Sequence, residues 1–197
     1  WLQSRNEDGS WKRYDADWRE STYKNYFWMV PYDLQGLIDS IGGKEAAEKR
    51  LDEMFRRLDA SYGDEWFASG NEPSFQIPWI YNWAGAPYKA QQVIRRILNE
   101  QYSSSVNGLP GNDDLGSMGA WYVFASIGLF PEIPGVGGFS VNSPVFRKIV
   151  LHLPEGDVII KGGDERKEYI HSLSLDGKKM EGTWIDWSDL YRGATLE

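Results

Sequence analysis

The residues of this chain that could do chemistry are carboxylates in loops, and two of them are adjacent. Asp113 and Asp114 lie in the loop 109–116, Leu-Pro-Gly-Asn-Asp-Asp-Leu-Gly, directly before an apolar, aromatic segment. The proline and glycines of this loop restrict its backbone, so its conformation should be tightly specified. The simplest interpretation is that Asn112, Asp113 or Asp114 caps the helix that follows.

A second carboxylate, Glu20, precedes a dense aromatic cluster that includes Tyr26-Phe27-Trp28. A carboxylic acid beside aromatic side chains is partly desolvated, and desolvation raises its pKa. A protonated Glu20 would suit a general acid. The alternative is a glutamate in the first turn of a helix, or one paired with Arg19 or Lys24.

A third carboxylate, Glu72, lies in Gly70-Asn71-Glu72-Pro73-Ser74, where the proline favours a loop over a helical face. Carboxylate, amide and backbone carbonyl oxygens within a few residues would suit a hard cation. The alternative is a loop glutamate that binds no ligand.

The composition excludes several other kinds of function. The chain has 197 residues and a net charge of −8, and no cluster of lysine and arginine stands out, which argues against nucleic acid and anionic membranes as partners. There is no cysteine, so disulfides and thiolate sites are excluded. The two histidines, His152 and His171, lie far in sequence from the acidic loops, which argues against a histidine triad or a zinc site. No apolar run approaches the roughly 20 residues of a membrane span.

The apolar pattern predicts helices in the first two thirds of the chain. Residues Ala47, Leu51, Met54, Phe55 and Leu58 share one face of a helix over 44–60. A helix over 117–129 is apolar nearly all round, so we expect other elements to surround it. The remaining predicted helices cover 33–41, 77–84 and 88–102.

After a boundary rich in proline and glycine at 130–138, the pattern alternates and predicts strands over 148–153, 157–161, 169–175 and 183–187. Asp176-Gly177 is a strong hairpin signal. The predicted class is therefore α+β, with a helical part over 1–138 and a small antiparallel β region over 139–197. The chain starts at Trp1 inside a patterned segment, so we expect it to be a piece of a longer protein.

Carboxylates in an aromatic setting fit glycoside hydrolysis, in which one acid protonates the leaving group and a second carboxylate activates water. Aromatic rings also stack on the apolar faces of sugars. This reading from residue types alone is unspecific, because any acidic protein offers several loop carboxylates.

Three blocks give the chain a more specific resemblance. Glu20 followed by Trp28-Met29-Val30-Pro31-Tyr32-Asp33, then Gly70-Asn71-Glu72-Pro73-Ser74, and Gly111 through Val123 resemble, in order, the sequence blocks of glycoside hydrolase family 92. Gly128-Leu129-Phe130-Pro131, Ser143-Pro144-Val145-Phe146 and Asp176-Gly177-Lys178 continue the match over essentially the whole chain.

The resemblance implies a bacterial exo-α-mannosidase, often specific for α-1,2 links, that inverts configuration and uses a calcium ion to bind mannose. It implies an N-terminal β-sandwich and an (α/α)6 barrel, of which this chain resembles only the last barrel helices and the C-terminal strands. The substrate would be a mannose-containing oligosaccharide or a glycoprotein N-glycan, and the protein would be periplasmic or secreted.

By the same resemblance, Glu20 is at the general-acid position and Asp114 at the general-base position, with Asn112 or Asp113 assisting near the water. Glu72 matches the calcium-binding glutamate, and a backbone carbonyl near Phe75 or Gln76 is a further ligand. The expected substrate contacts are Trp18, Lys24, Asn71 and Glu72.

Two departures from the family pattern leave alternatives open. Ser21 to Asn25 replaces a run of small and aromatic residues, so Thr22 or Lys24 is placed to contact an unusual leaving group. Phe75 replaces a histidine after the Glu72 block, which would alter the subsite for the leaving sugar. The alternatives are a non-catalytic mannose-binding fragment and an enzyme that cleaves mannose-1-phospho-mannose, although loss of the acid is typical there and Glu20 is retained.

Overall fold

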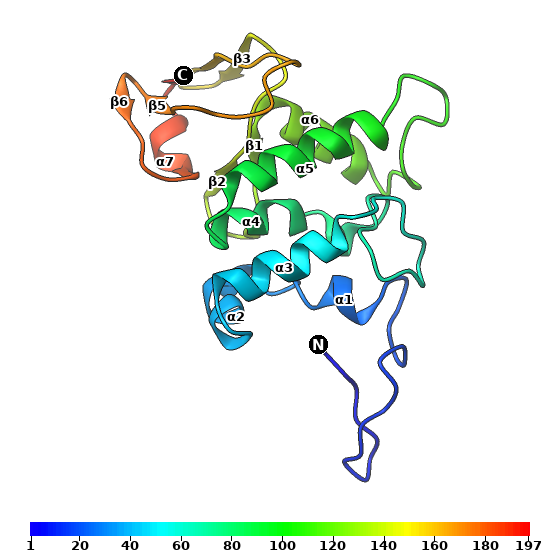
Figure 1. Cartoon of the computed structure of the whole chain (residues 1–197). Helices are drawn as coiled ribbons and strands as arrows, with labels where there is room; N and C mark the ends of the chain where they lie inside the picture. The colour runs from blue at the N-terminus through cyan, green and yellow to red at the C-terminus, as the bar shows by residue number, and fades with distance from the viewer.

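Helices make up most of the first two thirds of the chain, and strands make up most of the rest (Figure 1). The structure, a computed structural model, describes residues 1–197. An irregular arm, residues 1–20, extends from the helical body, and the strands gather at the opposite end. None of the helices is long and apolar enough to cross a membrane. The predicted α+β class is confirmed, whereas the assignment of the helices to an (α/α)6 barrel and the division at residue 138 stay predictions.

Most predicted helices are present, with ends set by local chemistry. Asp33 caps α2 by accepting a hydrogen bond from the backbone N–H of Gly36 at 3.0 Å. Gly128, in the left-handed conformation at φ +86°, ends α6. The helical elements are α1 (Tyr23–Tyr26), η1 (Pro31–Asp33), α2 (Leu34–Ser40), α3 (Lys44–Met54), η2 (Glu72–Ser74), η3 (Ile77–Trp79), α4 (Ile80–Trp83), α5 (Pro87–Glu100), α6 (Ser117–Ile127) and α7 (Trp187–Leu190).

The helix predicted over 44–60 is too long, because α3 ends at Met54. The Met54 carbonyl accepts a hydrogen bond from the N–H of Phe67, and Ala60 donates to the Phe67 carbonyl. The returning chain therefore takes over backbone groups that a longer helix would use. Phe55 and Leu58 remain buried, so the apolar pattern correctly identified core residues beyond the true helix end.

The strands form two sheets in place of the single small sheet that the sequence predicted. One has the order β1-β2-β7, with β1 (Leu129–Phe130), β2 (Gly138–Val141) and β7 (Trp184–Asp186) antiparallel. The other has the order β3-β4-β8-β5-β6 and consists of β3 (Lys148–Leu153), β4 (Gly156–Lys161), β8 (Ala194–Leu196), β5 (Ser174–Leu175) and β6 (Lys178–Lys179). One neighbouring pair in it, β4 with β8, is parallel. The Asp176-Gly177 turn joins β5 to β6, as predicted, and both residues have positive φ.

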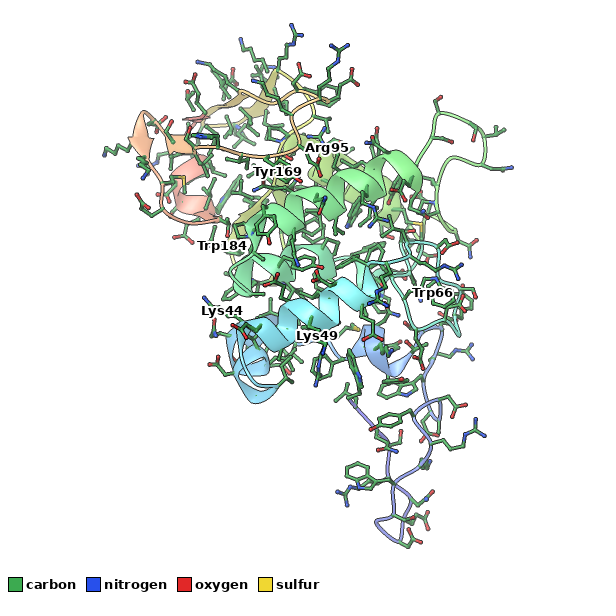
Figure 2. The ribbon with its side chains drawn as sticks, viewed as in Figure 1. Lys44, Lys49, Trp66, Arg95, Tyr169 and Trp184 are labelled. Atoms are coloured by element: carbon green, nitrogen blue, oxygen red, sulfur yellow. The ribbon has the colours of Figure 1, made fainter.

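The strand predicted over 169–175 is wrong except for its last two residues. The backbone before β5 is held mainly by side chains, two of them from helix α5. Ile170 donates its N–H to the Gln91 side chain at 2.9 Å, and Arg95 donates to the Lys167 carbonyl at 3.0 Å. Figure 2 shows Arg95 and Tyr169 between α5 and the strands.

Two apolar clusters stabilise these parts. The larger one contains 26 buried residues from Phe27 to Phe130, and the smaller one contains eight from Leu129 to Leu196. Trp79 and Phe130 of the larger cluster stack at 3.9 Å, and the Trp79 N–H donates at 3.2 Å to the side chain of Asn142, which follows Val141 of the smaller cluster. The expectation that α6 is surrounded is wrong within this chain, because Tyr122 and Val123 are exposed.

A buried carboxylate, Glu132, joins α4 to β2. Its Oε2 accepts hydrogen bonds from the Ser140 hydroxyl and, at 3.2 Å, from the Trp83 indole. Its Oε1 is buried and has no hydrogen-bond partner. Burial raises the pKa of Glu132 to about 7, because the charged form loses its hydration.

We therefore predict that Glu132 makes folding stability depend on pH. The unfolded carboxyl ionises near 4.5 while the folded one stays protonated up to about 7, so stability should fall as pH rises between these values. The total change should be on the order of 3 kcal/mol, since one pKa unit corresponds to about 1.4 kcal/mol. Urea unfolding from pH 4 to pH 8 measures it. Glu132→Gln should flatten the dependence, whereas the exposed control Glu181→Gln should leave it; an equal slope in all three proteins would contradict the prediction.

Candidate active site

The three acidic loops meet at Gly70 and Asn71. The buried Asn71 side chain donates a hydrogen bond to the Glu20 backbone carbonyl. The Gly70 backbone lies against Pro110 and Gly111 so closely that a side-chain carbon at Gly70 would collide with the Pro110 carbonyl. The loops that carry Glu20, Glu72 and Asp114 are therefore neighbours along one edge of the molecule, on the right in Figure 1.

The Glu20 loop is held through its aromatic neighbours. Trp18 stacks on Tyr26 with ring centroids 5.5 Å apart, and the Tyr26 hydroxyl donates to the Arg19 carbonyl at 2.8 Å. Glu20 itself has a backbone φ of +57°, in the left-handed region that a residue other than glycine rarely adopts. The aromatic cluster thus fixes the backbone on either side of Glu20.

The predicted desolvation of Glu20 is wrong for this structure. Its side chain is 54% exposed, and Oε1 lies 3.6 Å from Nε of Arg19. The aromatic rings that follow it pack mainly with one another, for example Phe27 on Trp28 at 5.1 Å. The pairing with Arg19 that the sequence left open as an alternative is therefore the one observed.

Lys24, a predicted substrate contact, is engaged elsewhere. Its side chain is only 13% exposed, and its ammonium group lies 2.9 Å from a Glu65 carboxylate oxygen and 3.2 Å from one of Glu53. These two ion pairs join α1 to α3 and to the segment before Trp66, which is labelled in Figure 2. The arrangement gives Lys24 a structural role, and its contact with a substrate stays a prediction.

The Glu72 loop is fixed by buried hydrogen bonds on both sides. The Ser74 hydroxyl donates to the Asn25 side chain at 3.0 Å, which joins η2 to α1. The Trp121 indole donates to the Phe75 carbonyl at 3.0 Å, which joins the same loop to α6. Sequence reasoning missed Ser74, Asn25 and Trp121 as positioning residues. Their position in or near the acidic sequence blocks could have identified them. The partners to which they bond lie elsewhere in the chain, and the sequence does not show those pairings.

The side chains around Glu72 fit a hard cation in their chemistry. The Glu72 carboxylate is exposed and takes part in no ion pair. The Gln76 amide nitrogen donates to the Trp28 carbonyl at 3.5 Å, which leaves its carbonyl oxygen free to coordinate. No group of three or more acidic or histidine side chains gathers anywhere in the chain. Backbone carbonyls and water would therefore supply the remaining oxygen ligands that calcium requires.

The loop before α6 divides its polar residues between two roles. The Asp113 carboxylate accepts a hydrogen bond from the Gly119 N–H at 3.0 Å, so Asp113 caps the first turn of α6. Asn112 and Asp114 are exposed and make no such contact. Residues 113–116 all have positive φ, between +42° and +87°. This continuous left-handed stretch presents Asp114 at the loop surface and reserves Asp113 for the helix.

Comparison with known proteins identifies the family to which the sequence is similar. A sequence model of the glycosyl hydrolase family 92 catalytic domain matches residues 1–197. An uncharacterized secreted glycosidase of Arthroderma benhamiae is 31% identical over 188 residues, covering 90% of this chain and 23% of that protein.

Solved structures show the same fold. The family GH92 α-mannosidase BT3965 from Bacteroides thetaiotaomicron superimposes with a TM-score of 0.87 at 32% identity, over 98% of this chain and 27% of that one. The family GH92 inverting mannosidase BT2199 from the same organism gives 0.87 at 29% identity, over 99% of this chain and 30% of that one. The chain therefore spans about a quarter to a third of the length of the relatives it matches.

We predict that Asn71→Ala loosens the junction between the loops. The substitution removes a buried donor and leaves the Glu20 carbonyl unpaired, which should lower the free energy of unfolding by about 1–2 kcal/mol. Urea unfolding followed by tryptophan fluorescence measures the change. Asn107→Ala, an exposed asparagine in the segment after α5, is the matched control. Equal stability of the two variants would show that the Asn71 hydrogen bond does not hold the loops.

Proposed function

Because this chain belongs to glycosyl hydrolase family 92, we propose that it carries the acid, the base and the metal-binding loop of an inverting exo-α-mannosidase. The observation that supports this most directly is the convergence of the three acidic loops at Gly70 and Asn71. The solved relatives at a TM-score of 0.87 are described as an α-mannosidase and an inverting mannosidase. The complete protein would act on mannose-containing glycans, with α-1,2-linked mannose as the first substrate to test.

Glu20 and Asp114 divide the work of an inverting hydrolase. Glu20, exposed on its loop, holds the proton that the departing glycosidic oxygen takes up. Asp114 accepts a proton from the attacking water on the opposite face of the sugar. Asn112 lies beside Asp114 and orients that water, whereas Asp113 supports the loop through its hydrogen bond to Gly119.

Glu72 and Gln76 would hold a calcium ion at the junction. When bound there, the ion would supply a fixed positive charge that orients the hydroxyl groups of the terminal mannose. The chain's own part is to keep this oxygen-rich loop in place, which Ser74 and Trp121 do through buried hydrogen bonds. Trp18 offers an aromatic surface next to Glu20 for the sugar.

The protein would be exported, since its fungal relative is described as secreted. Degradation of N-glycans is the biological role that we propose to test with glycoprotein substrates.

Exchange of the acid and the base should give different kinetic results. Glu20→Gln should lower kcat/KM for mannobiose by about 100-fold or more, yet affect an activated aryl mannoside less, because a good leaving group needs no proton. Asp114→Asn should lower both by a similar factor, since every substrate needs the activated water. Proton NMR of the first product should show the β-anomer of mannose. Equal losses on both substrates for Glu20→Gln would contradict the acid role, and an α-anomer would contradict inversion.

Calcium removal should abolish turnover reversibly. A chelator should stop hydrolysis of α-1,2-, α-1,3- and α-1,6-mannobiose, and added calcium should restore it. Glu72→Ala should raise the calcium concentration needed for half-maximal activity by about tenfold or more, as loss of a charged ligand does. The exposed control Glu181→Ala should not. Calorimetry with mannose completes the test: binding without turnover of any mannobiose or of mannose-1-phospho-mannose would favour a non-catalytic sugar-binding role.

A further inference from the structure

A polar cavity lies away from the acidic loops, between α5, α6 and the turns that flank β3 and β4. It has a volume of about 450 Å³, within the roughly 300–1,000 Å³ usual for small-molecule pockets. Its lining includes Arg95 and Asn99 of α5, Tyr122 and Ser126 of α6, and Phe146. None of the carboxylates assigned to the active site lines it.

Two polar side chains that line this cavity have unused hydrogen-bonding capacity. The Asn99 amide is exposed and makes no side-chain hydrogen bond within the chain. Arg95 is only 7% exposed, and its hydrogen bonds go to backbone carbonyls and the Ser143 hydroxyl through Nη1 and Nη2. Its Nε donates to no protein acceptor, so the guanidinium group retains a donor. In Figure 2, Arg95 projects from α5 on the side of the strands.

The rim combines aromatic rings with charges that compensate one another. Tyr122 is 42% exposed and Phe146 is 56% exposed, so both rings offer surface to a ligand. Arg147 pairs with Asp164 at 3.0 Å, which lowers the attraction of the site for a free anion. Aromatic faces next to hydroxyl, amide and guanidinium groups match a ligand that has both C–H faces and hydroxyl groups.

We propose that this cavity is an ancillary binding site for a neutral hexose unit of a glycan. The ring would stack on Tyr122 or Phe146, and its hydroxyls would bond to Arg95 Nε and to the exposed Asn99 side-chain amide. The choice of mannose as the hexose rests on the proposed function. Such a site would retain a branched glycan while its terminal mannose is cleaved at the acidic loops.

Calorimetric titration of the full-length natural protein with methyl α-mannoside tests the proposal. Glu72→Ala should remove the site at the acidic loops and leave the ancillary one. When Tyr122→Ala and Phe146→Ala are combined with Glu72→Ala, this remaining binding should weaken about tenfold or more, because the aromatic contacts are lost. Tyr32→Ala, an aromatic residue 81% exposed on η1, is the matched control and should change nothing.

The outcomes separate this proposal from the proposed function. The ancillary site is overturned if Glu72→Ala binds no methyl α-mannoside, or if its remaining binding persists in the aromatic variants. Neither result excludes mannosidase activity at the acidic loops. Binding that depends on Tyr122 and Phe146 supports the site even if no mannoside is hydrolysed. Binding of inorganic phosphate without binding of the mannoside would also overturn it, because the arginines would then form an anion site.

As a second readout, Tyr122→Ala with Phe146→Ala should lower kcat/KM severalfold on a branched mannan and leave that on an aryl mannoside unchanged. A merely structural effect of these exposed residues would lower both, and circular dichroism would report it. Equal losses on the two substrates would overturn the proposal.

Discussion

The close approach of backbone at Gly70 is the constraint on which the candidate active site depends. A side-chain carbon at Gly70 would meet the Pro110 carbonyl, and one at Gly111 would meet the Gly70 carbonyl, so each glycine is required by the other. Asn71, the next residue, binds the Glu20 backbone. Backbone contacts therefore position the three loops, and the carboxylates of Glu20, Glu72 and Asp114 are left without buried partners. These carboxylates are therefore free to exchange protons or bind a metal, because none of them has to hold the fold together through buried hydrogen bonds.

Backbone strain is concentrated at the same loops. Glu20 and the residues 113–115 are not glycine, yet all have φ between +42° and +64°. Each such residue costs about 1–2 kcal/mol relative to its relaxed conformation. The hydrogen bonds from Tyr26 to the Arg19 carbonyl and from Gly119 to Asp113 offset part of this cost. The surrounding fold thus holds the predicted acid and base in conformations that the isolated loops would leave.

The sequence predicted what depends on local chemistry and missed what depends on distant partners. The helix over 33–41 and the turn at Asp176-Gly177 follow from neighbouring residues, and both are present. The end of α3 at Met54 depends on Phe67, and no periodicity in the helix reveals that partner. At the candidate site, the resemblance identified the three loops, whereas the exposure of Glu20 depends on how Trp18 and Tyr26 pack. The ion pairs of Lys24 were missed for a similar reason, since its partners Glu53 and Glu65 lie far along the chain.

Helix α5 explains why residues 169–173 do not form the predicted strand. An alternating sequence forms a strand only if a neighbouring strand accepts its backbone groups. Here Gln91 of α5 accepts a hydrogen bond from the Ile170 N–H, and Arg95 of α5 donates to the Lys167 carbonyl just before this stretch. Because the side chain of a helix reaches the segment from one side only, the segment stays irregular and does not lie flat on the sheet. Arg95 thus has two places in the fold: it holds the chain just before this stretch, and it lines the cavity beside α5.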